Sequence, residues 1–238
     1  MRINKYLSSH GICSRREADR AIVEGKVLVN SAIASPGMDV SEGDEVLFYG
    51  QRVGKRPEIV VLAYWKKVGT VSSTVNQGKE QNNIVDEVGF ESRVYPVGRL
   101  DKDSEGIILL TNDGELANSL LKSSNGHEKE YEVLVDREIS ESDLLAIRKG
   151  GLQIIPEEKR LTKPCKMERL GNKRYSLILT EGMNREIRRI MEFFGYQVES
   201  LKRTRFVTVT LDGLRPGEYR MLNHDEVEEL RNLGAAQK

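Results

Sequence analysis

Apolar residues recur with helical spacing at the start of the chain and with strand-like spacing soon after it. Residues 3–10 are predicted to form a short helix. Ser14 followed three residues later by Glu17 matches a capping box that opens a second helix. Gly25 ends this helix, and residues 26–30 have the composition of a strand that leads into a turn. The chain therefore begins with helix, helix and strand.

A change in composition after the next strand predicts a domain boundary. That strand is expected at residues 46–49, and the polar, basic stretch at 50–57 that follows contains two glycines and a proline. The apolar run at 59–64 then begins a new core. We therefore expect a small domain of residues 1–57, whose last part, 50–57, is a linker, and a larger domain of residues 58–238.

The larger domain has short apolar runs and helical patterns without a regular alternation of strand and helix. Strands are predicted at residues 59–64, 107–111, 130–136, 174–180 and 205–211, and helices at 113–122, 140–149 and 183–194. Strands that follow one another in this way favour a mainly antiparallel or mixed sheet flanked by helices. The fold class is therefore α+β.

Composition allows two domains but gives no overall charge that would attract nucleic acid. The 238 residues include 37 basic and 37 acidic side chains, so binding to RNA would have to depend on local clusters. The start of the chain lacks the apolar core of a signal peptide, and no run of 18 apolar residues follows it. We expect a cytoplasmic protein, monomeric and not associated with a membrane.

Two segments concentrate basic residues. In the first, six basic residues face three acidic ones, and the basic ones are Arg2, Lys5, Arg15, Arg16, Arg20 and Lys26. The second is the segment 183–205, where again six oppose three, and its basic residues are Arg185, Arg188, Arg189, Lys202, Arg203 and Arg205. Both clusters suit contacts to phosphates, and a solvated helix face explains each of them as well.

The segment 98–106 crowds charged residues directly before an apolar strand. They are Arg99, Asp101, Lys102, Asp103 and Glu105. A carboxylate fixed at the edge of a buried strand, beside a cation, suits a nucleophile or a proton acceptor. Spacing alone favours a capping or surface ion pair, since charged loops are usually only solvated. On the strand predicted at 130–136, Tyr131 points inward, either as a core tyrosine or as a platform on which a base stacks.

Other chemistries lack their motifs. The three histidines and two cysteines show no repeated spacing of metal ligands. The chain has no glycine-rich dinucleotide motif, no P-loop and no Gly-x-Ser-x-Gly elbow. We expect neither a metal nor a cofactor.

The stretch from Gly98 through Gly114 resembles the catalytic segment of the RsuA-type pseudouridine synthases. Residues 1–60, which include Ser14-Arg15-Arg16-Glu17-Ala18-Asp19, resemble the small S-four-type RNA-binding module that precedes the catalytic domain in that family. Residues 127–131 and 201–205 are most similar to the RluF branch, which modifies 23S ribosomal RNA. The resemblance therefore covers both expected domains and implies a pseudouridine synthase fold.

The resemblance also implies roles for individual residues. Asp101 would be the catalytic aspartate, Tyr131 would stack on the flipped base, and Arg188 would pair with Asp101, a pairing that keeps a carboxylate charged and oriented. The residues expected to hold the loop or the RNA are Arg99, Arg2, Lys5, Arg15, Arg16, Arg20, Lys26, Arg185, Arg189 and Arg203. The chain departs from the family at Glu186, where Gln is more frequent, and at Ser31, where Gly is common.

We therefore expect an isomerase that converts a uridine of 23S ribosomal RNA to pseudouridine by base flipping, with transfer RNA as a second candidate substrate. The sequence leaves open whether Asp101 attacks the ribose or first acts as a base. Within the family, a 16S ribosomal RNA or transfer RNA synthase is the alternative. A non-catalytic RNA-binding protein is another, and a glycosidase using Asp101 and Asp103 is disfavoured, since adjacent carboxylates need not lie across a substrate.

Overall fold

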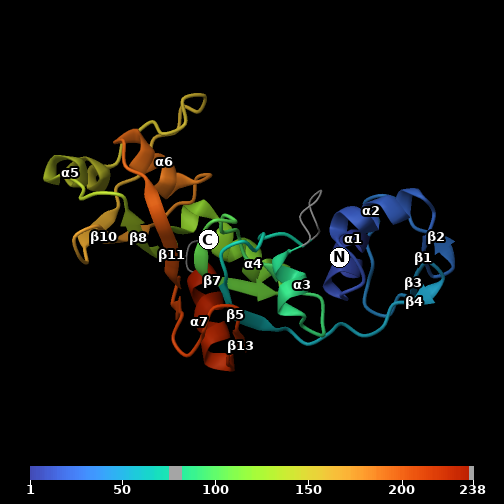
Figure 1. The fold of residues 1–238 in the computed structure, drawn as a ribbon. Coiled ribbons are helices and arrows are strands. Elements are labelled where there is room, and N and C mark those ends of the chain that lie inside the picture. The colour runs from blue at the N-terminus through green and yellow to red at the C-terminus, as the bar shows by residue number, and fades with distance from the viewer. Residues whose placement is uncertain (75–81, 236–238) are drawn as a thin grey trace. The chain divides into compact units, whose positions relative to one another are not determined.

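The computed structural model describes residues 1–74 and 82–235, and the chain divides into two compact units (Figure 1). The smaller unit consists of Met1–Val60 together with Glu91–Arg93 and Asn112–Gly114. The remaining residues form the larger unit. The boundary predicted after residue 57 lies close to the end of the first of these segments.

The smaller unit begins with two helices and continues as a small antiparallel sheet. Its elements are α1 (Ile3–Ser9), α2 (Arg15–Val23), β1 (Val27–Val29), β2 (Ala32–Ile33), β3 (Val46–Phe48) and β4 (Gln51–Arg52). The four strands pair in the order β2-β1-β3-β4. The predicted capping box is present: the backbone N–H of Glu17 donates to Ser14 Oγ at 3.2 Å, and that of Ser14 donates to the Glu17 carboxylate at 3.4 Å.

One detail of this unit differs from the sequence interpretation, and a second gives the conformation at Ser31. The linker predicted at 50–57 is shorter, because Gln51–Arg52 pairs with β3 and belongs to the first sheet. In the turn after β1, both Asn30 and Ser31 have positive φ angles, 49° and 67°. Ser31 thus adopts a left-handed conformation that glycine would adopt more easily, which explains why this position favours glycine.

The larger unit is built on one mixed sheet. Its strands are β5 (Val61–Lys66), β6 (Tyr95–Pro96), β7 (Glu105–Thr111), β8 (Lys129–Val135), β9 (Lys166–Arg169), β10 (Arg174–Leu179), β11 (Val198–Phe206), β12 (Val209–Thr210) and β13 (Tyr219–Met221). The main order is β13-β5-β7-β11-β8-β10-β9, with β12 on β11 and β6 on β7. Among the described residues β7 and β11 are the one parallel pair, which confirms the predicted mixed, mainly antiparallel sheet.

Helices cover this sheet and divide its apolar residues between two cores. They are α3 (Ile84–Val88), α4 (Gly114–Leu121), α5 (Glu141–Lys149), α6 (Glu186–Phe193) and α7 (His224–Ala235), with a short 3₁₀ helix at Ser123–Asn125. One core joins β8 and β10 to α5 and α6; the other joins β5 and β7 to α4 and α7 (Figure 1). No helix within residues 1–74 and 82–235 has both the length and the apolar character needed to cross a membrane.

Several boundaries differ from the predicted ones. The last strand was expected at 205–211, but β11 already starts at Val198, and the chain turns at Val207, where φ is 57°, before β12. The helix expected at 183–194 begins only at Glu186. The elements α3, α7, β9 and β13 were not predicted; β9, for example, has one buried residue in four and so lacks an apolar alternation.

The two parallel strands approach closely where the charged segment 98–106 enters the sheet. Gly106 has a φ of 115°, and a Cβ atom placed on it would lie 2.2 Å from the carbonyl oxygen of Arg203 on β11. Only glycine fits such an approach without displacing a backbone. Gly106 thereby fixes the distance between β11 and the loop that carries Asp101.

Candidate active site

The loop between β6 and β7 carries Asp101 and is held by the segment that follows β5. The backbone N–H of Ser104 donates to the Asp101 carbonyl at 3.1 Å and closes a turn. Ser72 Oγ accepts from the N–H of Leu100 at 3.1 Å and donates to its carbonyl at 2.9 Å. The N–H of Gly69 donates to the Lys102 carbonyl at 2.7 Å. These bonds set the loop in one conformation.

A buried lysine lies beneath this loop. Lys66, the last residue of β5, is fully buried, and its Nζ donates to the carbonyls of Ser104 at 2.7 Å and Lys67 at 2.9 Å. Burial lowers the pKa of Lys66 to about 8, against the attraction of nearby carboxylates, among them Glu87 and Asp101. The acidic loop therefore rests on a cation that the solvent does not reach.

Arg185 is the arginine that meets Asp101. A guanidinium nitrogen of Arg185 lies 3.7 Å from the Asp101 carboxylate, whose side chain is 29% exposed. Arg185 precedes α6 and has a left-handed backbone with φ of 52°. The turn that produces this conformation is stabilised by Glu186, whose Oε2 accepts the backbone N–H of Met183 at 2.8 Å. The geometry of the turn directs the arginine toward the loop.

Asp103 pairs with two arginines. Arg185 Nη1 and Nη2 donate to its carboxylate, at 3.3 and 3.1 Å, and Arg188 Nε forms an ion pair with it at 3.3 Å. Burial raises the pKa of Asp103, but the hydrogen bond from Arg185 and the charges of the two arginines outweigh it and hold the pKa below its usual value. Asp103 is thus a charged anchor for both arginines.

The predicted pairing of Arg188 with Asp101 is corrected by this geometry. Arg188 Nη2 donates to the Asp103 carbonyl at 2.8 Å and Nη1 to the carbonyl of Val198 on β11 at 3.3 Å. Because α6 begins later than expected, Arg185 lies outside the helix and turns back toward the loop. Arg188, almost one helical turn further on, lies between the loop and β11 instead.

A cavity of about 480 Å³ opens beside these groups. Its lining includes Arg99, Asp101, Tyr131 and Arg185, whereas Arg188 is not among the described residues that line it. The volume is in the usual range for sites that take small molecules or single bases. No three His, Cys, Asp or Glu side chains in residues 1–74 and 82–235 are grouped so that they could hold a metal ion.

Tyr131 reaches the cavity from the centre of the sheet. It is half-buried on β8, opposite Arg203 of β11 and Leu177 of β10, and it packs against the core that joins β8 to α6. The prediction of an inward-facing tyrosine is confirmed, and one side of its environment is the cavity. An aromatic residue so placed suits stacking against a planar ring.

The basic residues of 198–206 do not form the phosphate-binding cluster expected from the sequence. Arg203 is buried, its Nε donates to the Ile107 carbonyl at 2.8 Å, and its guanidinium lies 5.0 Å from the centre of the Phe206 ring. Lys202 and Arg205 form ion pairs with carboxylates of β8, at 3.1 and 3.0 Å. Pairing of β11 with β8 therefore neutralises the charges of Lys202 and Arg205 within the sheet.

The basic residues of the smaller unit remain largely on its surface. Four of them are exposed, on α2 or just after it: Arg15, Arg16, Arg20 and Lys26. Arg2 is also exposed and forms an ion pair with Asp39 at 3.4 Å, whereas Lys5 is half-buried. In the larger unit, half-buried Arg189 donates to Asn184 at 3.5 Å. The exposed set on α2 has the accessibility that phosphate contacts require.

Comparison with known proteins identifies both parts of the chain. Residues 59–193 match the family described as RNA pseudouridylate synthase, and residues 1–46 match the S4 domain. The chain belongs to the RNA pseudouridylate synthase family. The resemblance seen in the sequence is thereby confirmed, and with it the expectation of an isomerase that acts on RNA.

Individual relatives cover nearly the whole of this synthase. The dual-specificity RNA pseudouridine synthase RluF of Escherichia coli strain K12 is 45% identical over 235 residues, which are 98% of this chain and 79% of that protein. The ribosomal large subunit pseudouridine synthase B of Bacillus subtilis strain 168 is 35% identical, covering 98% and 96%. A crystal structure of a pseudouridylate synthase aligns with a TM-score of 0.70 at 29% identity, covering 97% and 99%, which confirms the fold.

Parts of the site of this synthase could not be found from the sequence. Lys66 gave one usable signal, because a charged residue at the end of an apolar strand is unusual and needs buried partners. Ser72 and Lys129, which unlike Lys66 line the cavity, gave none, since isolated polar residues in loops and at strand ends are common. Glu181 and Arg160 line it as well and lie in loops whose course the sequence does not predict.

Proposed function

We propose that this synthase isomerises a uridine of 23S ribosomal RNA to pseudouridine, with Asp101 as the carboxylate that reacts. The observation that carries the proposal is that Asp101, Tyr131 and Arg185, which come from a loop, a strand and a helix start, line one cavity. The names of two relatives support the RNA class: one is a dual-specificity RNA pseudouridine synthase and the other a ribosomal large subunit synthase.

The reaction rearranges one nucleotide and consumes nothing else. The bond from ribose carbon 1 to uracil nitrogen 1 breaks, the base turns, and carbon 1 bonds to uracil carbon 5. Carbon 5 loses its proton, and nitrogen 1 ends with one. The uridine must first leave its stack, at a cost of about a few kcal/mol. Stacking on Tyr131, worth roughly 1–3 kcal/mol per base, offsets part of that cost.

Each side chain then has a separate task. Asp101 acts at the ribose, and Arg185 stabilises its negative charge and limits its orientations. Arg188 holds the loop by bridging Asp103 and β11, so its contribution is to position the loop rather than to touch the base. Arg99 lines the cavity and is available to the phosphate of the flipped nucleotide.

The S4 domain binds the RNA. Its exposed residues Arg15, Arg16, Arg20 and Lys26 are placed on or beside one helix, where they neutralise phosphates. RNA is recognised mainly through its shape and its unpaired bases, so the domain selects a folded region rather than a sequence. Binding there offsets the remaining cost of extracting the uridine.

The experiment that tests the chemistry compares Asp101→Asn with Asp103→Asn in single-turnover reactions on purified ribosomal RNA. We expect Asp101→Asn to form no pseudouridine while it binds RNA with unchanged affinity. Asp103→Asn, the matched change two residues away, should slow the reaction by about 10- to 100-fold because it weakens the anchor of both arginines. Turnover by Asp101→Asn would refute the assignment, and release of free uracil would identify a glycosidase instead.

The RNA target is tested in cells. Pseudouridine should disappear from one position of 23S ribosomal RNA in a strain that lacks the gene, and the wild-type gene should restore it. Loss confined to 16S ribosomal RNA would exclude the proposed target. A loss in transfer RNA in addition to 23S RNA would show a second substrate.

A further inference from the structure

Two buried carboxyl groups lie together in the wall of the active-site cavity. Glu181 follows β10 and Glu186 begins α6, and their exposures are 2% and 5%. Each carboxyl group shifts the pKa of the other, which makes them close neighbours in this wall. Glu186 Oε2 accepts the N–H of Met183, but Glu186 Oε1 is buried without any donor. A buried oxygen that lacks a donor is unfavourable for a carboxylate, whereas in a carboxylic acid the same oxygen can itself donate to an acceptor.

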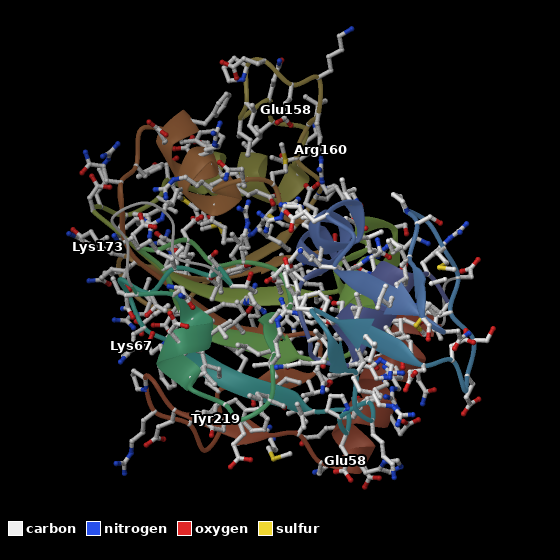
Figure 2. The ribbon with its side chains drawn as sticks, turned by 90° about the vertical axis from the view of Figure 1, so that its right-hand side faces the viewer. Glu58, Lys67, Glu158, Arg160, Lys173 and Tyr219 are labelled. Atoms are coloured by element: carbon white, nitrogen blue, oxygen red, sulfur yellow. The ribbon has the colours of Figure 1, made fainter. Side chains whose placement is uncertain are left out.

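Glu181 is the partner that carries the charge. Its carboxylate accepts the backbone N–H of Lys163 at 2.5 Å and Nη2 of Arg160 at 2.6 Å. Both come from the loop between α5 and β9, on which Figure 2 labels Arg160. Burial raises the pKa of Glu181, but these two donors outweigh it and hold the pKa below its usual value. A charged Glu181 can accept a hydrogen bond from the carboxyl group of Glu186.

We propose that Glu186 carries a proton up to near-neutral pH and donates it in a hydrogen bond from Oε1 to the Glu181 carboxylate. Glu186 is then a positioning residue. Its carboxyl group accepts from Met183 in the turn before α6 and donates to Glu181, which also binds Arg160 of the α5–β9 loop. The inference rests on the proposed function of Asp101 and Arg185 only for its effect on rate. The protonation itself is a property of the folded chain.

The surroundings of Glu186 favour the protonated form. Burial comes first and the negative charge of Glu181 also contributes, and together they raise the pKa of Glu186 to about 7 against the N–H of Met183 and the charge of Arg160. Burial thus outweighs the nearest donor and cation.

Two further elements face the same two carboxyl groups. Lys129 of β8 contributes an ammonium group whose pKa is itself lowered by burial and by Arg203, and it lies near the Lys163 side chain of the α5–β9 loop. Burial raises the pKa of the Cys165 thiol to about 11, so this group stays neutral. None of these neighbours donates to Glu186 Oε1.

Loss of the proton would place two negative charges side by side in a buried wall. The bond between Glu186 and Glu181 would be lost, and repulsion would separate the Arg185 turn from the Arg160 loop. Arg185 would then be held less firmly 3.7 Å from Asp101. The reaction rate should therefore fall as the pH rises through the pKa of Glu186.

The test is the pH profile of the single-turnover rate in wild type and three variants. The wild-type rate should fall on the alkaline side with a midpoint near pH 7. Glu186→Gln should keep a rate within about threefold of the low-pH wild type and lose this alkaline fall, because an amide donates at every pH. Glu186→Ala should be slow throughout. Glu192→Gln, the same change at an exposed position of α6, should keep the wild-type profile.

Difference infrared spectroscopy provides a readout that needs no substrate. Wild type should show a protonated carboxyl band at mildly acidic pH that disappears with the same midpoint, and Glu186→Gln should lack it. If no RNA is isomerised but the band behaves as described, the proposed function fails and this inference stands. An unchanged alkaline fall in Glu186→Gln, or the absence of the band from wild type, would overturn the inference.

Discussion

Arg185 lies 3.7 Å from Asp101 because the backbone of Arg185 turns left-handed directly before α6. The φ angle of 52° places this side chain outside the helix, where it reaches both Asp101 and Asp103. Arg188 stays inside the helix and contacts Asp103 and β11. The two arginines should therefore fail in different ways when they are removed.

Arg185→Ala should lower the single-turnover rate by about 100-fold, since a preorganised cation beside the reacting carboxylate is lost. Its unfolding temperature should change little, because the side chain is 43% exposed. Arg188→Ala should lower both the rate and the unfolding temperature, because its guanidinium connects Asp103 to β11 from a site that is 14% exposed. Rates from rapid quench and melting curves measure the two effects.

Arg189→Ala is the control for both variants. It removes an arginine charge from α6 close to both residues, and the one side-chain hydrogen bond of Arg189 in the described part of the chain is with Asn184 at 3.5 Å. It should leave the rate at saturating RNA and the melting curve close to wild type. An Arg185→Ala enzyme as fast as this control would contradict the assignment of Arg185 as the partner of Asp101.

Gly106→Ala should destabilise the larger unit by about 3 kcal/mol or more, because overpacking and a positive φ angle each cost about 1–3 kcal/mol. The added Cβ would meet the Arg203 carbonyl at 2.2 Å, and neither parallel strand can move away alone. Denaturant unfolding measures the loss. Gly171→Ala is the matched control, since its Cβ would meet nothing within 4 Å. Equal stability of the two variants would rule out close packing at Gly106.

Lys66→Met should change how stability depends on pH. In the unfolded chain Lys66 has its ordinary pKa of 10.5, and burial lowers this to about 8 in the fold. Between these values the unfolded state binds more protons, so the wild-type free energy of unfolding should rise with pH relative to Lys66→Met. One pKa unit corresponds to about 1.4 kcal/mol, so the rise should approach about 3 kcal/mol.

The neighbouring Lys67, labelled in Figure 2, is the control for this change. Its side chain is 49% exposed and pairs with Glu87 at 2.6 Å. Lys67→Met therefore removes a lysine from the neighbouring position and leaves the buried lysine in place. Urea unfolding at several pH values measures both differences. A parallel pH dependence of wild type and Lys66→Met would show that Lys66 is not held in a desolvated site.

Local patterns determined the elements that form from near neighbours. The capping box at Ser14 needs only two side chains and the backbone between them, so it could be predicted and is present. The alternation at 130–136 likewise predicted β8 and the inward position of Tyr131. The loop that carries Asp101 was found through its charges and its resemblance to a family. Its place on the cavity was not contained in its own pattern.

Tertiary structure decided which residues meet across the chain. Asp101 and Arg185 are brought together by sheet register and by one left-handed residue, and nothing in the spacing distinguishes Arg185 from Arg188. The sequence pattern places Arg203 in a basic cluster suited to phosphate contacts. In the fold, the parallel pairing of β11 with β7 buries it. Contacts between distant residues depend on how whole elements pack, and sequence patterns record only which face of each element is apolar.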